Sequence, residues 1–158
     1  MPYLNYCCLI WGNSSQTLLN KLLILQKKAV RIIDNQHRIA HSNPIFIKLQ
    51  LLKLSDIAKQ QSILVMHSVI TREAPTLIRS LFNLSPPNHR GSRVTRHFIE
   101  IFTRKLYRIR TIAWFGPRLW NSSISSVFPQ LSAIPRSKQL IKNITKRQIM
   151  QEYDQIVR

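Results

Sequence analysis

The alternation of apolar and polar positions is most regular from Thr17 to Asp34. Apolar side chains recur there at steps of three and four residues, at Leu18, Leu22, Leu25, Ala29, Ile32 and Ile33. This is the period of an α-helix, so we predict a helix that Ser14 or Ser15 caps and whose apolar stripe faces the core. Cationic side chains lie beside and behind that stripe, at Lys21, Lys27, Lys28 and Arg31. The same helix therefore combines a predicted core face with a cationic face.

Similar but shorter patterns predict three further helices. A short one begins near Pro44, a second runs from Ser55 to about Arg72, and a last, very basic one runs from Arg136 to Tyr153. The segment from Phe98 to Ile112 fits a strand, an extended segment or a helix equally well. The chain has only 3 glycines and few strand-like alternations, which argues against an all-β fold. The expected fold class is mainly α: a helical bundle with an irregular basic connector and a C-terminal extension that ends in a helix.

Composition divides the chain into three expected segments. Residues 1–82 form a helical domain, residues 83–97 a basic connector that contains prolines, and residues 98–158 an extension that packs on the helical part. Four residues are predicted structural anchors, namely Trp11, Gly116, Pro117 and Trp120. We expect Gly116-Pro117 to turn the backbone, and we favour packing over base stacking for the tryptophans because their rings bury a large area.

Charge points to a polyanionic partner. The chain has 24 Lys and Arg against 6 Asp and Glu, a formal charge of +18. This charge is spread along the whole sequence, which favours nucleic acid (RNA, an RNA–DNA hybrid or a DNA duplex) over a membrane surface. No apolar run reaches the length of a bilayer span and no secretory signal is visible, so we expect an intracellular protein, nuclear or cytoplasmic.

Two groups of cations are the candidate phosphate contacts. The first is Lys21, Lys27, Lys28 and Arg31, for which an ordinary solvated lysine face is the alternative interpretation. The second is Arg104, Arg108 and Arg110, which alternate with aromatic and aliphatic side chains. Such a mixture suits phosphate contacts combined with stacking on bases or sugars.

The residue types needed for catalysis are not arranged in any recognisable motif. The six acidic residues are scattered, so they do not provide the clustered carboxylates of a two-metal site. Isolated glycines exclude a phosphate-cradling loop, and Cys7 and Cys8 lie in an apolar segment. His37 and His41 lack further metal ligands at suitable spacing. We therefore expect no enzyme active site, no metal, no cofactor and no small-molecule substrate.

Several stretches, in this order and spacing, resemble the region after the polymerase core in reverse transcriptases of non-LTR retrotransposons, the jockey-like elements especially. They are Pro2 to Cys7, Ile10 to Gly12, Leu25 to Ile33, His41 to Phe46, Leu51 to Ile57 and Gly116 to Asn121. The resemblance implies a thumb-like helical domain and a C-terminal extension that hold template RNA and primer–template duplex. The catalytic motifs of the palm are absent from this sequence, so the missing upstream polymerase domain would be a partner. The chain begins inside the first matching stretch, as expected of a truncated copy.

The alternative from another class is an intracellular basic structural protein, such as a ribosomal or mitochondrial component that packs RNA. Co-sedimentation with ribosomes would favour this alternative. A transposon origin predicts coding sequence for a palm domain immediately upstream of Met1.

Overall fold

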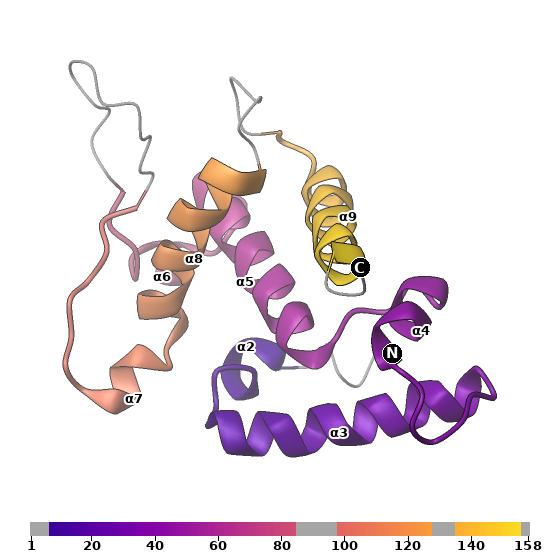
Figure 1. Cartoon of the computed structure of the whole chain (residues 1–158). Coiled ribbons are helices and arrows are strands. Elements are labelled where there is room, and N and C mark those ends of the chain that lie inside the picture. Colours follow the sequence, from indigo (N-terminus) through magenta and orange to yellow (C-terminus); the bar gives the residue numbers. More distant parts are fainter. Residues whose placement is uncertain (1–6, 85–97, 128–134, 156–158) are drawn as a thin grey trace. The chain divides into compact units, whose positions relative to one another are not determined.

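A computed structural model describes residues 7–84, 98–127 and 135–155. These residues form helices α2 (Cys8–Trp11), α3 (Gln16–Ile33), α4 (Ser42–Lys48), α5 (Leu54–Ile70), α6 (Thr76–Arg79), α7 (Leu106–Ile109), α8 (Ile112–Val127) and α9 (Lys138–Gln155) (Figure 1). The predicted mainly helical fold with a final helix is confirmed. In the described parts, β pairing is limited to one isolated antiparallel bridge between Leu84 and Phe98.

Contacts group the chain into two compact units with boundaries that differ from the expected 1–82, 83–97 and 98–158. The first unit comprises residues 1–60 and 143–158, and the second comprises residues 61–142. The helices α5 and α9 each contribute to both units. Of the expected connector 83–97, only Asn83 and Leu84 lie within the described residues.

The core of the first unit joins the first helices to the end of the last one. Its buried apolar residues are Cys8, Val30, Ile45, Phe46, Leu52, Ile57, Ile149, Met150 and Tyr153, and Trp11 packs at its edge. The Tyr153 hydroxyl donates a hydrogen bond to the Asp56 carboxylate and accepts one from the Lys53 backbone N–H at 3.0 Å. These two bonds fasten α9 to the beginning of α5, far away in sequence.

The prediction that the apolar stripe of α3 faces the core is wrong. The large side chains of the apolar stripe are between 43% and 78% exposed, whereas Gln26 and Val30 are the buried residues of this helix. The Gln26 amide donates to the Leu52 carbonyl at 2.9 Å and accepts from the Leu54 N–H at 3.0 Å. A buried amide that satisfies two backbone groups is favourable, and it fixes the rotation of α3 about its axis.

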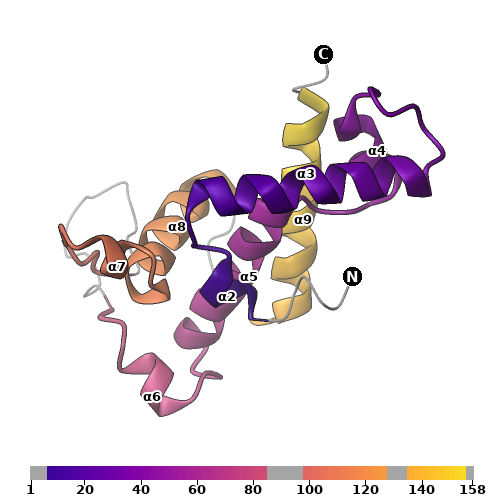
Figure 2. The same cartoon turned by 90° about the horizontal axis from the view of Figure 1, so that it is seen from below.

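The ends of α3 and α4 are sharp because each helix closes with the same backbone motif. Asn35 and Gln50 adopt left-handed backbone angles, with φ of 50° and 53°. After α3, the Gln36 N–H reaches the Arg31 carbonyl at 2.9 Å, and α4 closes in the same way. These hydrogen bonds satisfy carbonyls that the helix leaves unpaired, so the chain turns abruptly from α3 towards α4, as Figure 2 shows.

Gly12 ends α2, as its position suggests, but with an ordinary helical φ of −66°. Its importance is steric: a Cβ atom there would lie 2.5 Å from the Cβ of Ala58 and 2.3 Å from the Cys8 carbonyl oxygen. The absence of a side chain therefore lets α2 approach the beginning of α5 within the first unit.

In the second unit, Gly116 and Pro117 lie inside α8 and do not turn the chain as predicted. A Cβ on Gly116 would lie 2.6 Å from the Met66 sulfur of α5, so the glycine permits close packing of the two helices. Pro117 and Trp120 are fully buried. The surrounding packing supports the helix despite the hydrogen bond that a proline cannot donate.

Candidate nucleic-acid interface

The predicted cations of α3 do not share one surface. Lys21 and Lys28 are exposed and lie two turns apart on the same side of the helix, whereas Lys27 and Arg31 are half-buried. Lys27 lies close enough to Lys53 for its charge to change the pKa of the Lys53 ammonium. Burial lowers the pKa of Lys53, the Asp56 carboxylate opposes this effect, and the charge of Lys27 adds to the lowering. Lys27 therefore belongs to the surroundings of the α4–α5 junction.

Two of the four predicted cations meet at a hollow of about 390 Å³ at the end of α3. We call it the basic hollow; it is lined by Lys28, Arg31, Ile32, Gln36 and Arg38. Arg31 is positioned by a hydrogen bond from its Nε to the Ala40 carbonyl at 2.8 Å, which also holds the loop that carries Arg38. A guanidinium has five N–H donors, so this bond leaves the Nη groups for an anion.

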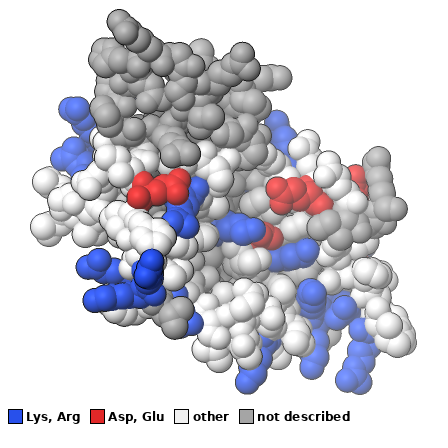
Figure 3. Space-filling view, turned by 60° about the vertical axis from the view of Figure 1, so that its left-hand side comes forward, with Lys and Arg blue, Asp and Glu red and all other residues white. Residues whose placement is uncertain are grey.

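No carboxylate neutralises the basic hollow among the residues that the structure describes. The nearest acid in sequence, Asp34, accepts a hydrogen bond and ion pair from the Lys48 ammonium. None of the three described ion pairs includes Lys28, Arg31 or Arg38. On the face drawn in Figure 3, groups of Lys and Arg line the lower part, whereas Asp and Glu lie beside Lys and Arg across the middle. The hollow can therefore attract a phosphate group.

The second predicted group lies in the second unit. Arg104, Arg108 and Arg110 are all exposed, Arg108 within α7 and Arg110 at its C-cap. Two aromatic side chains of the same segment are exposed as well, Phe102 at 77% and Tyr107 at 64%. This segment has the cations for phosphate contact and the rings for stacking on bases.

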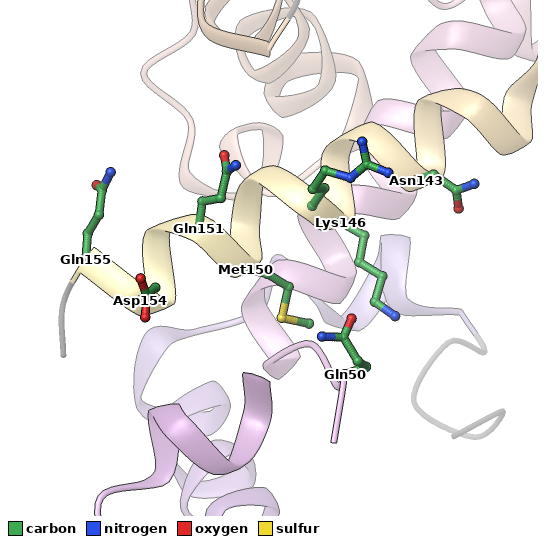
Figure 4. A pocket seen from close by; sticks show the side chains of 8 residues that line it. Gln50, Asn143, Lys146, Met150, Gln151, Asp154 and Gln155 are labelled. Atoms are coloured by element: carbon green, nitrogen blue, oxygen red, sulfur yellow. The ribbon is translucent and has the colours of Figure 1, made fainter. Parts of the chain in front are cut away.

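A larger hollow, of about 680 Å³, follows α9 and was missed in the sequence. Its lining comprises Gln50, Asn143, Lys146, Arg147, Met150, Gln151, Asp154 and Gln155. In Figure 4, Lys146 and Met150 extend from α9 towards Gln50. The three- and four-residue spacing of the α9 members is visible in the sequence, but the participation of Gln50 depends on how the chain folds back.

The four predicted anchors lie in packed positions. Trp11 borders the core of the first unit. In the second unit, the Trp120 ring contacts Phe98 edge to face, with centroids 6.4 Å apart, and lies at the same distance from His67. The neighbouring Asn121 amide holds the Phe98 backbone, donating to its carbonyl at 3.0 Å and accepting from its N–H at 3.4 Å. A completely buried Trp120 cannot stack on a nucleobase in this conformation.

Three acidic residues have structural partners. Asp34 pairs with Lys48, Asp56 binds Tyr153, and Glu100 accepts from the Asn121 amide at 3.1 Å. In the described parts of the chain, no group of three His, Cys, Asp or Glu side chains is placed to hold a metal ion. Nor does any helix there have the length and apolar character to cross a bilayer.

Comparison with known proteins adds no relative: no family model, no curated protein and no solved structure matches this chain.

Proposed function

We propose that this protein is a non-catalytic part of a retrotransposon reverse transcriptase that binds RNA or primer–template duplex through phosphate contacts. The observation that carries the proposal is the basic hollow, where Lys28, Arg31 and Arg38 converge without a carboxylate among the described residues. The family of origin is supported by the stretch from Leu25 to Ile33, which resembles the segment after the polymerase core in these enzymes. The same stretch contains Lys28 and Arg31, two of the three cations of the basic hollow.

Phosphate contacts of this kind position a nucleic acid without reading its sequence. Ammonium and guanidinium groups displace the counterions that are condensed on the backbone, so affinity falls as salt rises. The exposed segment of Arg104, Arg108 and Arg110 would add further contacts, and its aromatic neighbours would favour single-stranded regions with accessible bases.

The test is a titration of labelled RNA and DNA duplexes by fluorescence anisotropy at several salt concentrations. Replacing Lys28 and Arg38 together with glutamine should reduce the log–log salt slope by about 0.9 per lost contact and weaken binding roughly tenfold per contact at about 0.1 M salt. The loss should be similar for unrelated sequences.

Arg136→Gln with Lys138→Gln is the matched control, because both side chains are exposed and the charge change is the same. Equal losses in the two double variants would show that only net charge matters and would refute the role of the basic hollow. On a primed RNA with all four nucleotides, the chain alone should not extend the primer; extension would refute the non-catalytic part of the proposal.

A further inference from the structure

The exposed face of α3 is the most unusual surface of the first unit. The apolar stripe of Leu18, Leu22, Leu25, Ala29, Ile32 and Ile33 runs along most of the helix, and its large members are 43% to 78% exposed. Single exposed apolar side chains are ordinary, but a contiguous row along a helix marks a contact surface. The stripe spans about 24 Å at about 1.5 Å per residue.

Among the residues of α3, positive charge borders only one edge of this stripe. Lys21 lies one turn from Leu18 and Leu25, and Lys28 lies one turn from Leu25 and Ile32, so both exposed ammonium groups flank the apolar row. The opposite edge contains Gln26 and Val30, which are buried in the first unit. A partner on the stripe would therefore meet apolar side chains in the middle and cations on one side.

We propose that the α3 stripe docks an amphipathic helix of another protein that presents apolar side chains to the stripe and a row of Asp or Glu to Lys21 and Lys28. A helix lying along the stripe would bury apolar side chains of both partners, and the burial would provide most of the affinity. The carboxylates would fix the direction of the helix and exclude partners with basic edges.

Charge argues against a second copy of this chain as the occupant. An antiparallel pair centred on the stripe would place Lys21 of one copy near Lys28 of the other. In a parallel pair, the lysine edge of each helix would face the Gln26 and Val30 edge of the other copy, which is already buried in the first unit. The net charge of +18 adds to the repulsion between copies.

A bilayer is also disfavoured as the occupant. Helices that lie on anionic membranes have Trp or Phe on the apolar side and basic residues along the polar face. The α3 stripe contains only Leu, Ala and Ile, and its cations lie on a single edge.

The experiment uses the full chain and synthetic amphipathic peptides of about 18 residues, long enough to cover the stripe. One peptide has a Leu face with a Glu edge, a second has the same Leu face with a Lys edge, and a third is a scrambled version of the first. Binding of each fluorescent peptide is measured by anisotropy at moderate salt. The Glu-edged peptide should bind, and the other two should bind at least about tenfold more weakly.

Variants then locate the contact. Leu25→Gln with Ile32→Gln should weaken binding of the Glu-edged peptide about tenfold or more. Ile39→Gln is the control and should leave this binding unchanged, because Ile39 is 82% exposed but lies off the stripe. Lys21→Glu with Lys28→Glu should reverse the preference towards the Lys-edged peptide.

The same variants show whether something other than an acidic amphipathic helix occupies the stripe. The proposal is overturned if the scrambled peptide binds as tightly as the Glu-edged one, or if Leu25→Gln with Ile32→Gln changes nothing. It is equally overturned if that variant abolishes self-association in sedimentation velocity, or abolishes binding to phosphatidylserine vesicles, because a second copy or a bilayer would then occupy the stripe.

Discussion

Removing one hydroxyl group, by Tyr153→Phe, tests what holds α9 to the rest of the first unit. The hydroxyl donates to the buried Asp56 carboxylate and accepts from the Lys53 N–H. The ring contacts should persist in phenylalanine: the Phe46 ring lies 6.4 Å away and the Lys53 ammonium lies 4.0 Å above the ring. The variant therefore isolates the two hydrogen bonds.

The expected loss follows from the groups left behind. A hydrogen bond to a charged group contributes about 1.5–3 kcal/mol, and a backbone N–H left without its acceptor costs about 1–3 kcal/mol. Because water can reach the half-buried Lys53 and replace part of its bond, we expect a net destabilisation of about 2–4 kcal/mol.

Urea unfolding followed by circular dichroism at 222 nm measures this difference. Tyr107→Phe is the matched control, since the Tyr107 side chain is 64% exposed and the substitution should change stability by less than about 0.5 kcal/mol. If Tyr153→Phe is no more destabilising than Tyr107→Phe, the hydroxyl network does not fasten α9 and the reasoning is refuted.

Three further predictions concern pH, packing and helix ends. Burial, and then the bond to the Asp56 carboxylate, raise the pKa of the Tyr153 hydroxyl in the folded protein. The stability that this hydroxyl contributes is therefore complete below about pH 10, the ordinary pKa of tyrosine, and is lost progressively as pH rises above that value. Urea unfolding midpoints should fall more steeply above about pH 10 for Tyr107→Phe, which keeps Tyr153, than for Tyr153→Phe. Gly116→Ala should destabilise by about 1–2 kcal/mol in urea melts, since overpacking against Met66 outweighs the gain in helix propensity, and a smaller effect in a Met66→Ala background would verify the contact. Gln50→Gly should raise stability by up to about 1 kcal/mol because glycine adopts the left-handed φ of 53° without strain, and a lower melting temperature would contradict it.

Much of the candidate interface could be predicted from residue types, but its arrangement could not. Lys28 and Arg31 were found in the sequence as members of one cationic helix, and the structure brings them together at the basic hollow. Arg38 was missed as a member of the set because its place depends on the loop that Arg31 holds through Ala40. Lys27 was included although it lies near Lys53, since helical spacing alone does not reveal which neighbours a side chain meets.

The Gly116 to Asn121 stretch shows the same limit in the second unit. The sequence indicated that its glycine, proline and tryptophan serve packing, but a Gly-Pro pair was expected to turn the chain. In the structure the pair is accommodated inside α8 because Gly116 faces Met66 and the helix is supported by burial on that side. The tertiary contact overrides the local preference of proline.

What the sequence determined by itself is the presence of α3, α4, α5 and α9, because helix formation depends on side-chain spacing, capping and propensity within a few residues. It did not determine α8, whose Gly-Pro pair locally favours a turn. It also determined the excess of positive charge, which no folding step can remove. Tertiary structure alone decided which side of α3 is buried. The amide of Gln26 satisfies two backbone groups between α4 and α5, so the helix places that amide and Val30 inside and leaves the stripe that includes Leu18, Leu22 and Leu25 exposed. Hydrophobic periodicity gives the direction of an apolar stripe, but the partners that satisfy buried polar groups come from distant parts of the chain, and they decide which face becomes the core.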